Sequence, residues 1–362
     1  MISRNNPASG GLKCGSYFVL ICVSFIPPCG TKIVTEPRQG VIQSLNSRCS
    51  RVQLELPALR MKTLLDQMIF HMIVLFSRTV GLVPRKAGAR LGTVLGRRLY
   101  HWDKRHASIA IENLTEAYAG EKNPKEIEAI ARRVFQNLGK VIFEICWSLS
   151  HDKKKQFRHF TIEGLSNIQK AYDQGRGVLG LTAHFGNWEL LTVIGAMLKY
   201  PSSIVYRPLD FRPMERFMVL FRTRFGAKMI PKKKAFRNIL KSLHRKEMVG
   251  LLMDQNVAWR EGVFADFFGR PACTNKGMAL LALKTGAPVI PAFLIRNQSG
   301  FTAKFLPEIP LIKTGDKVKD LEANTAQYNR VIESIVRQYP DQWFWVHRRW
   351  NTRPFYPWPR EN

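Results

Sequence analysis

Apolar residues in the second half of the chain occur in short runs separated by stretches with a helical repeat. Continuous apolar runs, typical of buried strands, occupy residues 177–183, 203–206, 249–253, 288–294 and 301–305. Apolar residues at steps of three and four indicate helices over residues 187–199, 215–225, 235–244, 277–285 and 323–338. This alternation predicts an α/β fold whose mostly parallel central sheet is flanked by helices.

The part of the chain before this alternation predicts helices only. Pro124 stands where a first-turn proline would, and apolar residues follow at positions 127, 130, 134, 138, 141 and 145, along one helix face. We therefore expect a helical region over residues 85–155 and an α/β domain over residues 156–362.

An apolar segment precedes the helical region. It is about as long as a helix that crosses or enters a bilayer, Pro84 ends it, and five Lys and Arg residues follow within residues 85–98. This pattern predicts a membrane-anchor helix over residues 61–84, held at an anionic cytoplasmic leaflet, whereas a buried core helix is the alternative. Asp66, His71 and Arg78 resist a place at the bilayer centre, which favours a tilted, shallow or partly covered helix.

Residues 1–60 differ from the rest of the chain. Their apolar run, 17–26, is too short to span a bilayer, and they hold four of the six cysteines. We expect these residues to be a poorly ordered extension or the result of a mis-assigned start. The other two cysteines, Cys146 and Cys273, lie far apart and no CxxC occurs, which argues against a disulfide framework and favours a reducing compartment.

The charge balance points to an acidic partner. The chain has 56 Lys and Arg residues against 27 Asp and Glu residues, a net charge of +29. Nucleic acid, an anionic membrane and an acidic protein all fit such a field. A basic nucleic-acid-binding protein is therefore an alternative of another class, although no aromatic RNP motif, helix-turn-helix or zinc-ligand pattern is visible in the sequence.

Candidate chemistry is concentrated in the stretch LTAHFGNWELLTVIGAML. His184 follows a predicted strand, Gly186 permits a tight turn, and Asn187 is a good N-cap for the next helix. Glu189 falls in the first helical turn, where its carboxylate can bond one imidazole nitrogen and leave the other to take a proton from an attacking hydroxyl. This predicts a catalytic pair of His184 and Glu189; a histidine that only caps a turn is the alternative.

Further polar residues follow other predicted strands and form a predicted substrate-binding set. Arg207 should reach the same sheet edge as His184, where it can bind phosphate or a developing oxyanion. Asp254 and Gln255 follow a buried strand, where they can position a substrate or simply form a turn. Arg348 follows an aromatic stretch and can bind phosphate or face a membrane surface. The whole set is Arg207, Asn187, Asp254, Gln255 and Arg348.

These residues lie within a recognisable pattern. HFGNWE resembles the HX4D/E block of the lysophospholipid acyltransferase superfamily. The surrounding sequence resembles the late acyltransferases of lipid A biosynthesis. Four more stretches match in order: IVYRPLD, DQN followed by VFADFFGR, NKGMALLALKTGAPVIPAF, and QWFWVHRRWNTRP. The resemblance covers about residues 61–358. A block like FPEGTR, usual in glycerolipid acyltransferases, does not occur, which favours a glycolipid acceptor.

The resemblance implies a function for the whole pattern. The donor would be an acyl carrier protein thioester, and the acceptor a hydroxyl of a lipid A precursor in the cytoplasmic face of the inner membrane, in lipopolysaccharide biosynthesis. Another glycolipid, such as a mannosylated phosphoinositide, is the alternative acceptor. Because a thioester is already activated, no metal, nucleotide cofactor, nucleic acid or covalent acyl-enzyme is needed. The basic runs 153–155 and 232–234 suit an acidic carrier protein or lipid head groups, although such runs are usually solvated.

Overall fold

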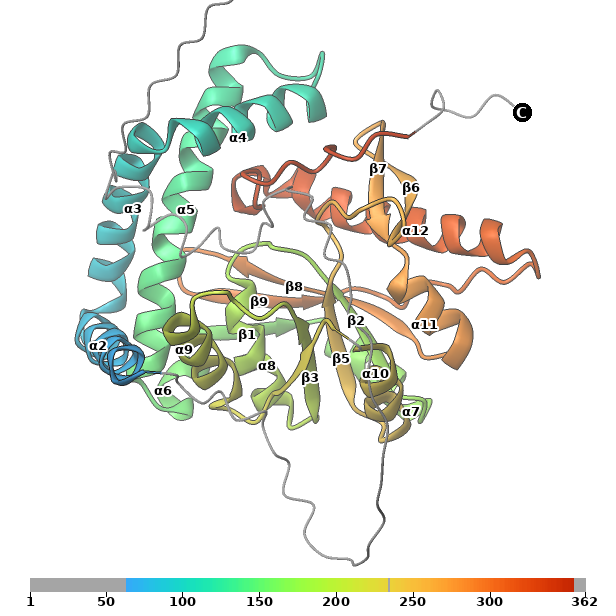
Figure 1. Cartoon of the computed structure of the whole chain (residues 1–362), viewed down its shortest axis with the longest axis horizontal. Helices are drawn as coiled ribbons and strands as arrows, with labels where there is room; N and C mark the ends of the chain where they lie inside the picture. The colour runs from blue at the N-terminus through green and yellow to red at the C-terminus, as the bar shows by residue number, and fades with distance from the viewer. Residues whose placement is uncertain (1–62, 234, 355–362) are drawn as a thin grey trace, which may run out of the picture.

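The computed structural model describes residues 63–233 and 235–354 and shows a central sheet covered by helices on both faces (Figure 1). Seven strands have the order β1-β9-β8-β2-β5-β3-β4, and all neighbouring pairs are parallel except β8 and β9. A separate antiparallel pair, β6 and β7, stands outside the sheet. The α/β fold with a mostly parallel sheet predicted from the sequence is thus confirmed.

The strands are short and most follow the predicted runs. Their bounds are β1 Phe160–Glu163, β2 Val178–Thr182, β3 Ser202–Tyr206, β4 Lys228–Pro231, β5 Met248–Leu252, β6 Gly262–Phe267, β7 Arg270–Asn275, β8 Val289–Arg296 and β9 Phe301–Phe305. The sequence pattern had not indicated β1, β4 or the β6–β7 pair.

Helices of two kinds surround the sheet. Those of the α/β part are α6 Lys153–Phe157, α7 Leu165–Asp173, α8 Leu191–Leu198, α9 Arg212–Thr223, α10 Ala235–His244, α11 Gly277–Thr285 and α12 Lys317–Gln338, with two 3-10 turns, η1 Trp188–Leu190 and η2 Pro340–Gln342. Before them come α2 Leu64–Gly81, α3 Arg85–Trp102, α4 Lys104–Ala117 and α5 Pro124–Ser150.

Side chains on the two faces of the sheet enter two separate apolar clusters. Leu179 and Leu181 of β2 pack with α10, α11 and α12, whereas Val178 packs with α7, α8 and α9. This division follows from the period of two along a strand, which sends successive side chains to opposite faces. The helices that cover one face therefore do not share a core with those that cover the other.

Helix α5 is the centre of the N-terminal helical part. It starts with a capping box, in which the Asn123 side chain accepts from the Glu126 backbone N–H and the Glu126 carboxylate accepts from the Asn123 N–H, and Pro124 occupies its first turn as predicted. Helices α2 and α3 both pack on α5, and α2 also packs on α9. The helical part is thus attached to the α/β part through α2 and α5.

Helix α2 is long and apolar enough to cross a membrane, by its length and composition. Only 17% of its residues are buried inside the protein, and its outer side carries a row of exposed apolar side chains. Residues 1–62 lie outside the described part of the chain, so the expectation for residues 1–60 concerns residues that the structure does not describe.

Candidate active site

Parallel pairing of β2 and β5 brings His184 and Asp254 together. Thr182 is the register partner of Leu252, and His184 and Asp254 each follow two residues later. In the structure, Asp254 Oδ1 lies 2.9 Å from His184 Nδ1, and Asp254 Oδ2 accepts the backbone N–H of His184 at 2.9 Å. Both side chains are almost fully buried. The carboxylate therefore fixes the position of the imidazole from two sides.

This arrangement corrects one prediction. The hydrogen bond to the imidazole that the sequence assigned to Glu189 is made by Asp254, which the sequence placed only in the substrate-binding set. The Glu189 carboxylate accepts from Arg222 Nε at 2.7 Å and from its other nitrogen at 2.6 Å. The reason lies in α9, because its buried Arg222 needs a counter-charge and faces the turn that carries Glu189.

Neighbouring groups keep the Asp254 carboxylate and the Arg222 guanidinium ionised. Burial alone raises the pKa of Asp254, but His184 and the hydrogen bond from Trp343 Nε1, at 2.8 Å, hold the pKa below its usual value. Burial alone would lower the pKa of Arg222. The charge and hydrogen bonds of Glu189 outweigh this effect of burial, so the pKa of Arg222 is raised. Asp254 is therefore an anion that accepts hydrogen bonds, and Arg222 is a buried cation.

The other nitrogen of His184 points toward Gln255. The two Nε2 atoms lie 3.4 Å apart, so Gln255 is close to the nitrogen that Asp254 leaves unused. The aromatic rings of Trp188 and Phe344 stand 5.2 and 5.9 Å from the imidazole, between ring centres. Trp188 also donates from Nε1 to Glu189 Oε1 at 3.0 Å, so Glu189 holds a ring that packs against His184.

Backbone contacts fix the turn after His184. Gly186 has a φ of +60°, and a Cβ at this position would overlap the carbonyl oxygen of Leu294, so only glycine fits. Its N–H donates to the Gln342 carbonyl at 2.8 Å, and the Phe344 N–H donates to the His184 carbonyl at 3.0 Å. The segment 343–346, with Trp343, Phe344 and Trp345, is buried and forms the floor of the site.

Asn187 does not cap the next helix as predicted. It makes no capping hydrogen bond through its side chain; it is fully buried and its Nδ2 donates to Glu144 Oε2 of α5 at 2.8 Å. Arg296, at the end of β8, donates to both oxygens of Glu144 at 2.6 and 2.7 Å. The side chain of Asn187 therefore ties the catalytic turn to the helical part, and it is not open to a bound substrate in this structure.

The two predicted basic residues lie on the surface. Arg207 follows β3 at the same sheet edge as His184 and is 38% exposed at its side chain, with Asp210 3.4 Å away. Arg348 is exposed, and its side chain makes no hydrogen bond or ion pair with any residue that the structure describes. Both guanidinium groups are thus accessible to an anionic ligand.

The neighbours of Arg348 are structural. Arg349 is fully buried and donates to the Cys273 carbonyl at 3.1 Å and to the Thr274 hydroxyl at 2.5 Å, which fastens the β6–β7 pair. His347 accepts the Asn256 N–H at its Nε2, at 2.7 Å. Burial, with the positive charge of Arg349, lowers the pKa of His347 to about 3, so this ring is neutral.

The phenylalanines of the FFGR stretch belong to the core. Phe267 and Phe268 are buried among Trp343, Trp345 and Trp350, and Phe268 adopts a φ of +58° in the turn between β6 and β7. They do not border an open groove in this structure. Of the two rings against His184, Trp188 is partly exposed and Phe344 is buried.

Comparison with known proteins agrees with the motif order. The family model described as Bacterial lipid A biosynthesis acyltransferase matches residues 59–352. The chain belongs to this family. Membership makes the protein an acyltransferase and confirms the resemblance found in its motifs. The match begins close to the predicted anchor segment and ends just after the HRRW stretch.

Individual relatives support the same assignment. The chain is 29% identical over 267 residues to the lipid A biosynthesis palmitoleoyltransferase of Escherichia coli, covering 73% of this chain and 85% of that protein. It is 28% identical over 269 residues to the lipid A biosynthesis lauroyltransferase of the same organism, with the same coverage. A phosphatidylinositol mannoside acyltransferase of Mycolicibacterium smegmatis is 25% identical over 190 residues, 51% of this chain and 60% of that protein.

Proposed function

We propose that this acyltransferase moves a fatty acyl chain from an acyl carrier protein thioester to a hydroxyl of a lipid A precursor. The observation that carries the chemistry is the buried contact between His184 Nδ1 and Asp254, at 2.9 Å, at the carboxyl edge of a parallel sheet. Ligands of open α/β sheets bind at this edge. A base with one nitrogen fixed by a carboxylate and the other facing Gln255 suits the deprotonation of a hydroxyl.

In the proposed reaction, Asp254 accepts a hydrogen bond from Nδ1–H of His184 and so leaves Nε2 unprotonated. Nε2 removes the proton of the acceptor hydroxyl while its oxygen attacks the thioester carbonyl carbon. The tetrahedral oxyanion then collapses, the C–S bond breaks, and the imidazolium returns the proton to the leaving thiolate. The products are the acyl ester and the free thiol. General-base action of this kind contributes about 10²–10⁴-fold in rate.

Glu189 acts through its neighbours in this proposal. Its carboxylate binds Arg222 and the indole N–H of Trp188, and the Trp188 ring packs against the imidazole. We therefore assign Glu189 as a positioning residue of the catalytic pair. Its negative charge also favours the imidazolium that forms during the reaction.

The substrate-binding proposal rests on exposed polar groups near the site. Gln255 is next to His184 Nε2 and suits the attacking hydroxyl. Arg207 and Arg348 present accessible guanidinium groups, which match the geometry of phosphate oxygens. Asn187 is retained only as a group that holds the turn, because its side chain is buried against Glu144.

The proposed location is the cytoplasmic face of the inner membrane, reached through helix α2. Exposed apolar residues on α2 and the basic residues that follow on α3 suit an anionic bilayer surface. A lipid acceptor in that leaflet would not have to leave the membrane. The names of the relatives, which refer to lipid A and to phosphatidylinositol mannoside, support a membrane lipid as acceptor.

The test is an acyl-transfer assay on membranes that contain the protein. Carrier protein thioesters of several chain lengths are offered with a lipid A precursor or a mannosylated phosphoinositide, and products are weighed by mass spectrometry. We expect a mass gain on the lipid A precursor. A gain only on the phosphoinositide would select the alternative acceptor, and no transfer together with salt-dependent nucleic-acid binding would favour the other class of function.

Two variants test the mechanism in the same assay. His184→Ala and Asp254→Asn should each lower kcat by about 10²–10⁴-fold with little change in the KM of either substrate, because each removes the base or its orientation. Circular dichroism should show an unchanged fold. Near-normal turnover in His184→Ala would exclude it as the base, and a loss confined to KM would make it a binding residue.

A further inference from the structure

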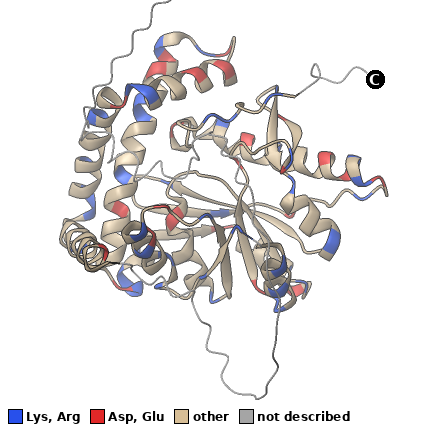
Figure 2. Cartoon of the chain, viewed as in Figure 1, with Lys and Arg blue, Asp and Glu red and all other residues tan. Residues whose placement is uncertain are grey.

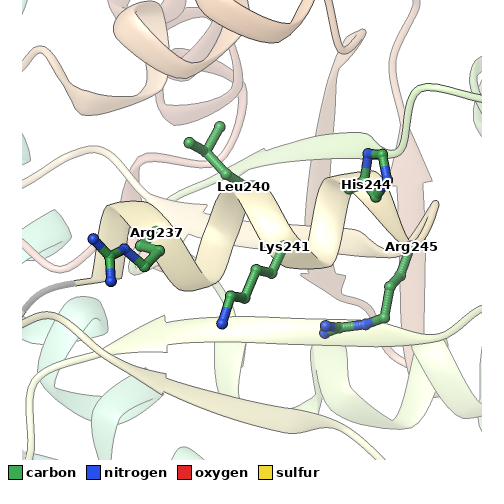
Figure 3. Close-up of a pocket in the computed structure, with 5 residues that line it drawn as sticks. All are labelled: Arg237, Leu240, Lys241, His244 and Arg245. Atoms are coloured by element: carbon green, nitrogen blue, oxygen red, sulfur yellow. The ribbon is translucent and has the colours of Figure 1, made fainter.

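Helix α10 lies in a strongly basic stretch of the α/β part. Residues 216–246, from within α9 to just past the end of α10, contain eleven Lys and Arg residues and no Asp or Glu. Of these, Arg237 and Lys241 on α10 and Arg245, the residue after its end, recur at steps of four, and all three are exposed. Figure 3 shows them extending from the same side of the helix, where with Leu240 and His244 they line a shallow hollow.

Two of these cations are not neutralised by the protein itself. Arg237 and Lys241 make no ion pair with the described residues, whereas Arg245 bonds to Glu247 at 2.9 Å and Lys232, before the helix, bonds to Glu261 at 2.7 Å. Figure 2 shows Lys and Arg along α10. Phe236, beside Arg237, is 41% exposed, with Lys284 of the neighbouring α11 over its ring. An exposed aromatic side chain among cations is typical of a protein interface, where aromatic residues and Arg are enriched.

The basic helix begins next to the proposed site. Strand β4 ends at Pro231, and the backbone N–H of Lys232 donates to the Tyr206 carbonyl at 2.7 Å. Tyr206 is the last residue of β3 and directly precedes Arg207. The first turn of α10, with Arg237, therefore lies near the carboxyl edge of the sheet, and Lys241 and Arg245 follow toward the amino edge, where β5 begins. A partner along α10 would reach the carboxyl edge at the helix start, from which a flexible acyl-bearing group can extend toward His184.

The position of α10 favours a soluble partner over a lipid surface. Helix α2 packs through Phe70 into the apolar cluster of α7, α8 and α9, whereas Ile239 and Leu243 of α10 belong to the cluster on the other face of the sheet. The apolar outer side of α2 and the basic side of α10 thus belong to opposite faces of the sheet. If α2 meets the membrane, α10 lies on the face of the sheet that does not.

We infer that the basic face of α10, formed by Arg237, Lys241 and Arg245 with Lys232 at its start, docks the acidic carrier protein that delivers the acyl thioester. This inference rests on the proposed function for the identity of the donor. Complementary charge at an interface rim raises the association rate and makes it salt-dependent. The docking step would therefore appear in the KM of the carrier thioester and not in the chemical step.

The experiment compares the full-length wild type with the charge reversal Arg237→Glu/Lys241→Glu. Its matched control is Lys317→Glu/Lys319→Glu, an equal charge change at exposed positions of α12. We expect the α10 variant to raise the KM for the carrier thioester about tenfold, with kcat and the KM of the acceptor unchanged. Raising the salt concentration should raise the wild-type KM and have little effect on that of the variant. The control should behave as the wild type.

Two further measurements separate the possible failures. Binding of the carrier protein without an acyl chain, measured by fluorescence anisotropy, tests the surface even if the wild type transfers no acyl group, in which case only the proposed function fails. Binding to vesicles with anionic lipids tests whether the basic face of α10 contacts a membrane surface instead of the carrier protein. An unchanged KM and unchanged carrier binding in the α10 variant would overturn the inference, and so would a loss of vesicle binding with an unchanged carrier KM.

Discussion

The buried ion pair between Glu189 and Arg222 makes a stability prediction. Both side chains are about 5% exposed, so removing one charge leaves the other buried without compensation, at a cost of about 3–5 kcal/mol. We expect Glu189→Gln to lower the unfolding midpoint in urea strongly. The double replacement Glu189→Met/Arg222→Met should regain most of the stability, because a well-packed apolar pair is often neutral.

This pair of variants also separates folding from catalysis. If the double variant is stable but turns over slowly, Glu189 contributes to the reaction by more than holding the fold. If it is stable and active, the ion pair is only structural. A single variant as stable as the wild type would contradict the burial argument itself.

His347 should make the protein less stable in acid. In the folded chain its pKa is lowered to about 3, chiefly by burial, whereas an unfolded chain has a histidine pKa near 6.5. Between these values the unfolded state binds a proton that the folded state does not. Stability is therefore complete above about pH 6.5 and falls by roughly 1.4 kcal/mol per pH unit as the pH drops toward 3.

The variant His347→Gln tests this dependence. The amide oxygen can still accept the Asn256 N–H, so stability near neutral pH should change little. Urea unfolding at a series of pH values should show a smaller loss between pH 6.5 and pH 4 than in the wild type. Equal slopes in the two proteins would show that His347 protonates freely in the folded state.

At the level of elements, a row of glycines joins α3 to α5. Gly88, Gly92 and Gly96 recur every four residues on α3, and Gly139 of α5 faces Gly92 and Gly96. A Cβ on Gly96 or Gly139 would overlap the backbone of the other helix, whereas a Cβ on Gly88 would meet only Phe143 at an ordinary 3.6 Å. The two backbones therefore touch at Gly92, Gly96 and Gly139 but not at Gly88.

The contrast predicts opposite effects of the same substitution. Gly96→Ala or Gly139→Ala should destabilise the protein by about 1–3 kcal/mol, because the helices must move apart. Gly88→Ala, the matched control, should be neutral or stabilising by up to about 1 kcal/mol, since alanine is the better helix former. The melting temperatures of the three variants test this prediction. Similar melting temperatures in all three would mean that α3 and α5 can move apart at little cost.

The sequence predicted the elements with a strong apolar pattern and missed those without one. Helices α10 and α11 begin and end as their apolar repeat indicated, because a buried helix face imposes that repeat. Strands β1 and β4 have four residues each and mix polar with apolar residues, so neither shows the continuous apolar run of a buried strand. The β6–β7 pair was missed since its apolar residues pack on both sides of the hairpin.

The site was predicted in part, for a similar reason. His184, Arg207 and Asp254 each follow a strand, so their common edge could be inferred from the sequence. Which carboxylate meets the imidazole is set by the register of β2 on β5, and the order of residues along one strand does not contain it. Arg222 had no signal, because a cation in an amphipathic helix usually faces water and this one is buried.

At the scale of the whole molecule, helix α2 presents two different sides. Phe70, Ile73 and Val74 pack into the core with α9, whereas exposed apolar side chains form the outer side: Leu64, Leu65, Met68, Met72, Leu75 and Phe76. Gln67, His71 and Arg78 share one exposed edge between these sides. An apolar row of this length with a polar edge suits a helix that lies in the membrane surface, packed on the protein below it.

Attachment through this row predicts how the protein leaves the membrane. Because the contact is apolar, washing membranes with high salt should not release the wild type, whereas detergent should. Leu75→Glu/Phe76→Glu should make salt release effective and should lower transfer to an acceptor in vesicles more than to one dispersed in detergent. The matched control, Gln67→Glu/His71→Glu on the polar edge, adds the same number of acids and should stay bound. Release of the wild type by salt alone would show that the attachment is electrostatic, carried by α3 and not by the apolar side of α2.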